Sequence, residues 1–266
     1  AGINRISLGV QSFNSEVLKG LGRAANENSS VKAYQYLREA GFNNVNLDLI
    51  FGGPSSSKKT DLKDLSIAVS MNPEHLSWYQ LTIEEGTAFF LNPPILPGDD
   101  EIYRSFSTGI NFLSRQEFER YEVSAYSRKS FKSQHNLNYW NYGDYIGIGA
   151  GAHGKRRDSK GIYRTEKPQN PRTYVKSYLS SDPDFLNRRV KPEEALEEYF
   201  INVTRLKDGF NEIDLFRKTE AWGFLEETKS KIDRAIKSGF LERTGPRLKP
   251  SDRGFMFLNN LQEILT

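Results

Sequence analysis

The feature that most constrains the fold is a short apolar run with one carboxylate inside it, at residues 46–54. The run reads Asn-Leu-Asp-Leu-Ile-Phe and ends in Gly-Gly-Pro. An apolar run of this length, bounded by turn residues, is typical of a buried strand in a parallel sheet. Ligands bind at the carboxyl ends of such strands. Asp48 is therefore a candidate binding residue, although it could instead only accept backbone hydrogen bonds from the Gly-rich loop.

Strands and helices alternate through the first half of the chain. Strands are expected at residues 5–10, 45–50, 75–82 and 121–124. Helical spacing predicts helices between them, at 14–21, 30–40, 55–70 and 100–115. This order indicates an α/β fold with βα units around a parallel sheet. Only about four units are present, whereas a closed barrel normally has eight, so we expect a partial barrel.

The second half of the chain has a different character. Periodicity stops at residues 127–164, where a Gly-rich stretch could approach a ligand or form a packed crossing. Further helices are expected at 171–180, 192–205, 211–219, 225–238 and from 251, with short strands at 240–242 and 247–249. Helices followed by a small hairpin resemble a winged helix. We therefore expect two domains, at 1–167 and 168–266, and favour packing or protein contact over nucleic-acid binding for the second.

Composition limits the class of protein. The chain has 266 residues, with 37% hydrophobic residues and a net charge of +3, which is too small to imply nucleic acid as a partner. No apolar run approaches the length of a membrane span and no signal peptide is visible, so we expect a cytoplasmic protein. There is no cysteine. This excludes disulfides and thiolate-bound metal clusters within this chain.

Candidate binding residues fall into two groups. Gln11 and Arg23 lie in loops near the strand that carries Asp48. A carboxylate suits ribose hydroxyls and an arginine grips a carboxylate, so the trio could hold a nucleoside with an amino-acid tail. Taken singly, Arg23 could be a solvated helix-end cation and Gln11 an ordinary loop residue. His135, beside Tyr139, could ligate haem iron or be held beneath a loop, whereas we expect His75 in a turn.

Several motifs together resemble one known family. Residues 3–13, 21–23 and 46–52 resemble the radical S-adenosylmethionine (SAM) proteins related to oxygen-independent coproporphyrinogen III oxidase. Residues 72–77, 81–87, 135–140 and 143–153 resemble its haem-chaperone branch, HemW. The resemblance covers essentially the whole chain. It implies a partial (βα)6 TIM-like barrel followed by a small C-terminal helical domain.

The resemblance also implies a function and a site. Residues that match Gln11, Arg23 and Asp48 contact SAM in this family, the strand that ends near Thr82 lines the same pocket, and the motif that begins at His135 binds haem. The implied function is a chaperone that passes haem to acceptor proteins. The sequence leaves open whether the protein is a homodimer. The alternative is the oxidative decarboxylation of coproporphyrinogen III. A third, weaker hypothesis is an interaction module that docks a partner through its C-terminal part.

One family feature is missing. The family holds a [4Fe–4S] cluster with cysteines in a loop after the first barrel strand, and this chain has none. The chain starts at Ala1, directly ahead of a predicted strand. We therefore expect it to be the C-terminal part of a longer protein, inactive in radical chemistry by itself. We also expect an open sheet edge and an Asp48 that is more solvated than in the whole protein.

Overall fold

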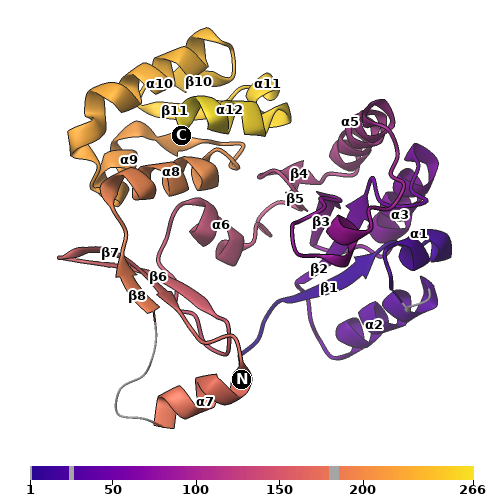
Figure 1. The fold of residues 1–266 in the computed structure, drawn as a ribbon. Coiled ribbons are helices and arrows are strands. Elements are labelled where there is room, and N and C mark those ends of the chain that lie inside the picture. The colour runs from indigo at the N-terminus through magenta and orange to yellow at the C-terminus, as the bar shows by residue number, and fades with distance from the viewer. Residues whose placement is uncertain (1, 24–26, 180–185) are drawn as a thin grey trace. The chain divides into compact units, whose positions relative to one another are not determined.

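The computed structural model describes residues 2–23, 27–179 and 186–266 and has mixed α/β content (Figure 1). The chain forms two compact units, Ala1–Lys132 and Ser133–Thr266. The boundary expected at 167 lies inside the second unit, because the strand just before it, Gly161–Glu166, pairs with the strand Leu186–Arg189 after it. Within the described ranges, no helix combines the length and the apolar character that a membrane crossing requires.

The first unit contains a five-stranded sheet in the order β1-β2-β3-β5-β4, with β1 at one edge. Its strands are β1 (Ile6–Gln11), β2 (Val45–Phe51), β3 (His75–Gln80), β4 (Glu119–Arg120) and β5 (Ala125–Ser127). β1, β2 and β3 are parallel, whereas β5 is antiparallel to both β3 and β4. The prediction of a strand at residues 121–124 is wrong. The chain reverses there, in a turn where the Glu122 carboxylate accepts a hydrogen bond from the Ser124 N–H at 3.0 Å.

The expected helices of the first unit are confirmed, with ends shifted by a few residues. They are α1 (Ser15–Gly20), α2 (Glu27–Glu39), α3 (Lys58–Ser70) and α5 (Asp99–Arg115). A further short helix, α4 (Ala88–Leu91), lies where the sequence analysis expected no helix. Asn14 caps α1 through its side chain, and Ser57 forms a reciprocal capping box with Thr60 at the start of α3. These caps fix the residue at which each helix begins after the loop that follows a strand.

The central strands have one apolar face and one polar face. Leu47, Leu49 and Trp78 are buried in the core with residues of α3 and α5. The strand register sets Asn46 beside His75, and Asp48 beside Ser77. Side chains alternate between the two faces of a strand, so these polar residues share the face opposite the apolar core. The predicted fully buried strand is therefore two-sided, and Asp48 is only half-buried.

The first part of the second unit contains a sheet that the sequence pattern did not indicate. After α6 (Gln134–Trp140), three antiparallel strands pair in the order β6 (His153–Asp158), β7 (Gly161–Glu166) and β8 (Leu186–Arg189). α7 (Pro171–Leu179) lies between β7 and β8 in the chain. These strands are short and half of their residues are charged, so only β7, with Ile162, Tyr163 and Thr165, carries a β-forming pattern.

The rest of the second unit matches the expected order of helices and hairpin. The elements are α8 (Pro192–Val203), β9 (Phe210–Asn211), α9 (Glu212–Thr219), η1 (Trp222–Phe224), α10 (Leu225–Lys237), β10 (Leu241–Thr244), β11 (Arg247–Pro250), α11 (Asp252–Met256) and α12 (Leu258–Leu265). The predicted hairpin is confirmed as β10 and β11, and β9 adds a third antiparallel strand. Buried residues such as Phe200, Leu215 and Ile232 join these elements into one core.

Candidate functional site

A cavity of about 370 Å³ lies at the carboxyl ends of β2 and β3. It is lined by Gln11, Asp48, Ile50, Tyr79, Gln80, Leu81 and Thr82. Three of the four residues predicted to bind one ligand, Gln11, Asp48 and Thr82, therefore come together in the structure. The position agrees with the rule that open parallel sheets bind ligands at the carboxyl ends of their strands.

Gln11 reaches the cavity through an unusual backbone conformation. Its φ is 68°, and the pairing register of β1 with β2 shifts between Gly9 and Gln11. A non-glycine residue in this region stores about 1 kcal/mol or more of strain, and such strain is concentrated at functional sites. The Gln11 side chain is among those that line the cavity, so the strained residue belongs to the candidate site.

A buried carboxylate from α3 holds the loop after Gln11. Asp64 accepts hydrogen bonds from Ser12 Oγ at 2.5 Å and from the Phe13 N–H at 2.9 Å. Burial raises the pKa of Asp64 to about 6, although the two hydrogen bonds act in the opposite direction and lower the pKa. Sequence analysis missed this residue. The available signal was an acidic side chain one position before Leu65, on a helix whose apolar face packs against the sheet.

A second α3 carboxylate holds the loop after β2 in the same way. Asp61 accepts a hydrogen bond from Ser56 Oγ, and burial raises the pKa of Asp61. Gly52, at the start of this loop, has a φ of 69° and a Cβ there would lie 3.4 Å from Ile102. One helix thus positions the loops that follow both β1 and β2, next to the cavity.

Asp48 is held on the polar face by its neighbours. Ser7 Oγ donates to Asp48 Oδ2 at 2.8 Å, and Asn46 Nδ2 donates to Asp48 Oδ1 at 2.8 Å. The turn position expected for His75 is wrong, because His75 is the fully buried first residue of β3. Burial lowers the pKa of His75 to about 3, with a smaller contribution from the charge of Arg5.

The remaining two predicted residues are not among those that line this cavity. Arg23 is exposed after α1, and its backbone N–H bonds the Leu18 carbonyl at 2.9 Å. It is not among the residues that line the cavity. In the second unit, His135 is exposed on α6, and its ring centroid lies 4.8 Å from that of Tyr139. Tyr139 in turn packs against Tyr145, with ring centroids 4.3 Å apart, which forms an aromatic cluster.

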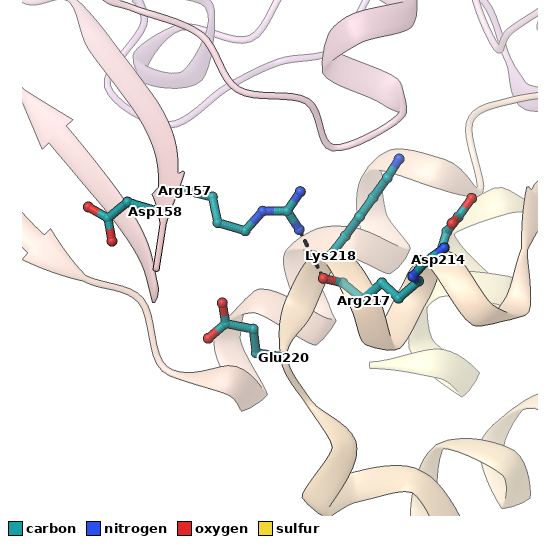
Figure 2. A pocket seen from close by; sticks show the side chains of 6 residues that line it. All are labelled: Arg157, Asp158, Asp214, Arg217, Lys218 and Glu220. Carbon is teal, nitrogen blue, oxygen red and sulfur yellow. Dashed lines mark hydrogen bonds between the residues drawn. The ribbon is translucent and has the colours of Figure 1, made fainter. Parts of the chain in front are cut away.

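A larger hollow, of about 540 Å³, lies in the second unit (Figure 2). It is lined by three cations and three anions: Arg157, Asp158, Asp214, Arg217, Lys218 and Glu220. Arg157 Nη1 donates to the Arg217 carbonyl at 2.9 Å, and Lys218 Nζ donates to the Asn141 carbonyl at 2.7 Å (Figure 2 shows the first). The basic groups thus satisfy backbone carbonyls at or near helix ends. The charges balance and have a structural use, so this hollow is not the candidate site.

The metal-donor side chains of the described residues do not gather at one place. Throughout the described residues, no group of three or more His, Asp or Glu side chains is arranged to hold a metal ion. The sequence contains no cysteine. These residues therefore do not fit a cysteine-ligated iron–sulfur cluster.

Comparison with known proteins identifies the family, although no protein-family model matches the chain. The heme chaperone HemW of Escherichia coli is 40% identical over 267 residues, which cover 99% of this chain and 68% of that protein. The chain belongs to the HemW family of haem chaperones. HemW of Haemophilus influenzae is 37% identical with the same coverage, and HemW of Lactococcus lactis is 30% identical.

The fold agrees with a solved structure. Coproporphyrinogen III oxidase from Escherichia coli, described as a radical SAM enzyme, superposes with a TM-score of 0.78 at 17% identity. The match covers 99% of this chain and 64% of the oxidase, so the HemW-family chain spans somewhat less than two thirds of that structure. The resemblance expected from the sequence motifs is thereby confirmed at the level of family and fold.

Proposed function

We propose that this protein is a radical SAM haem chaperone that binds SAM and haem and transfers the haem to acceptor proteins. The observation that carries the proposal is 37–40% identity over nearly the whole chain to several haem chaperones. The likeness to coproporphyrinogen III oxidase concerns the fold alone, at 17% identity. It gives no comparable support to the decarboxylase alternative.

The cavity at the ends of β2 and β3 fits the nucleoside part of SAM. The half-buried Asp48 carboxylate suits the two ribose hydroxyls, since a carboxylate has more acceptor positions than its two protein donors use. Gln11 and the Thr82 segment supply further polar groups, while Ile50 and Leu81 supply apolar walls. We propose that Arg23 reaches the amino-acid carboxylate. SAM would supply the adenosyl group of the family's radical chemistry, but these residues offer no cysteine for the cluster.

Asp48→Asn tests the SAM site. Replacing the carboxylate keeps the shape of the side chain and removes charge-assisted hydrogen bonds to the ribose, so the dissociation constant should rise at least about tenfold. Isothermal titration calorimetry with SAM measures it. Asp99→Asn, at the exposed start of α5, is the matched control. Unchanged affinity in Asp48→Asn would rule out Asp48 as the ribose ligand.

Haem is the cargo, and we propose His135 as an iron ligand. The imidazole is exposed on α6 next to Tyr139, whose ring packs against Tyr145, and these aromatic rings suit the face of a porphyrin. Titration of His135→Ala with haemin, followed at the Soret band, should show weaker binding than wild type. His153→Ala, which removes another exposed histidine, should bind normally. Equal binding by the two variants would refute the assignment.

The finer architecture is also a proposal. We propose that the sheet of the first unit is part of a (βα)6 radical SAM barrel. The three helices α8, α9 and α10, followed by the β10–β11 hairpin, support a winged-helix-like arrangement in the second unit. We propose acceptor proteins rather than nucleic acid as partners, and a homodimer as a possible assembly. Analytical ultracentrifugation with and without haemin tests the assembly.

A further inference from the structure

The Asp48 carboxylate is held from the protein side at both oxygens. Ser7 Oγ donates to Oδ2, and Asn46 Nδ2 donates to Oδ1. Asn46 Nδ2 also donates to Ser7 Oγ at 2.6 Å, so the three side chains form a closed ring of hydrogen bonds. This arrangement fixes the rotation of the carboxylate. It leaves each oxygen a lone pair for a ligand in the cavity.

The orientation of Asn46 follows from this ring. Carboxylate oxygens accept hydrogen bonds, so the amide nitrogen of Asn46 must face Asp48 and its oxygen must face away. Asn46 Oδ1 lies 2.5 Å from His75 Nδ1 and 3.1 Å from Ser77 Oγ. An amide oxygen only accepts, so His75 Nδ1 carries the proton and donates it.

The far side of the His75 ring completes the chain. Nε2 lies 2.8 Å from the Tyr121 hydroxyl. In a neutral ring with its proton on Nδ1, Nε2 is an acceptor, and Tyr121 therefore donates. Both His75 and Tyr121 are buried, which lowers the pKa of His75 to about 3 and keeps the ring neutral. Every polar atom of the His75 ring has a partner, and each hydrogen bond has one direction.

We propose that His75 is a positioning residue for ligand binding at Asp48: Tyr121, His75 and Asn46 form a directional hydrogen-bond chain that fixes the carboxylate facing the cavity. The chain starts in the turn between β4 and β5, crosses β3 and ends on β2. It thus connects the antiparallel end of the sheet to the cavity. The inference rests on the proposed function in one respect, that the ligand is SAM.

Histidine NMR tests the chain without any ligand. In the protein with ¹⁵N-labelled histidine, His75 should show a protonated Nδ1 and an unprotonated Nε2. His135→Gln and His153→Gln variants assign the three signals, since the chain has three histidines. A proton on Nε2 would break the chain at both ends and overturn the proposal.

Affinity tests the positioning role. His75→Leu removes the donor to Asn46 and should weaken SAM binding about tenfold, measured by calorimetry. His75→Asn offers an amide donor near the position of Nδ1 and should recover most of the affinity. Leu76→Ala is the matched control: it removes a fully buried side chain from the same strand on the opposite, apolar face, and should bind SAM as wild type does.

The outcomes separate the two proposals. Wild-type affinity in a folded His75→Leu variant would overturn the positioning role. If His75→Leu does not fold, His75→Asn decides the question: SAM binding by folded His75→Asn that is much weaker than that of wild type overturns the positioning role. If the wild type binds no SAM, the proposed function is refuted, and the tautomer measurement still supports or refutes the hydrogen-bond chain by itself.

Discussion

Asp64→Asn should flatten the dependence of stability on pH. The pKa of Asp64 is about 6 in the folded protein, because burial disfavours the charge, against 3.8 for an ordinary aspartate. A group whose folded pKa is raised stabilises the fold fully below the unfolded value, and this stability is lost as the pH rises through the folded value. The difference of about two pKa units corresponds to up to about 3 kcal/mol, lost between about pH 4 and pH 6.

The asparagine carries no charge, so this loss should disappear. Its amide can still accept from the Phe13 N–H, but it receives the Ser12 hydroxyl less well, which costs about 1 kcal/mol at every pH. Wild type should therefore lose up to about 3 kcal/mol more free energy of unfolding than Asp64→Asn between pH 4 and pH 7. The two curves should cross within that interval.

Urea unfolding at several pH values measures the effect. Trp78 belongs to the same unit as Asp64, so its fluorescence is followed with Trp140 and Trp222 replaced by Phe. Leu65→Ala is the control: it removes a fully buried neighbour on α3, lowers stability by about 2–5 kcal/mol, and should leave the pH slope of wild type unchanged. Parallel curves for wild type and Asp64→Asn would refute the reasoning.

Three further predictions concern packing, strain and a buried hydroxyl. Gly109→Ala should lower the melting temperature, because a Cβ there would lie 2.0 Å from the Trp78 ring. This overlap outweighs the gain in helix propensity of about 1 kcal/mol. An unchanged melting temperature would contradict the packing. Gln11→Gly should raise the free energy of unfolding by about 1 kcal/mol, since φ is 68°, yet weaken SAM binding; a loss of stability would show that Gln11 is not strained. Tyr142→Phe should cost about 1 kcal/mol in urea unfolding, because its hydroxyl donates to Glu198 at 2.6 Å; no loss would mean that water replaces the bond.

Local sequence signals predicted the elements that depend on near neighbours. The caps at Asn14 and Ser57, and the apolar spacing of α3 and α5, lie within single segments, so the helices were predictable. Asp48 was identified for the same reason, since a carboxylate inside an apolar run is visible in the sequence alone. The family followed from joint motifs and is confirmed by the relatives.

Pairing between distant segments was not predictable in this way. The antiparallel β5 depends on the turn near Glu122, and the β6–β8 sheet pairs short strands in which half of the residues are charged. Such pairings depend on which strands the rest of the fold brings together, which local propensity does not encode.

The polar face of the sheet most clearly separates what is predictable from the sequence from what depends on the tertiary structure. The sequence by itself determined that Asp48 sits on a strand before a Gly-rich loop. Only the tertiary structure placed His75 and Tyr121 on a chain of hydrogen bonds that leads to it, because residues 46, 75 and 121 meet only through strand register and burial. Burial is also what keeps His75 neutral, so that its Nε2 accepts from Tyr121, and burial is a property of the assembled sheet.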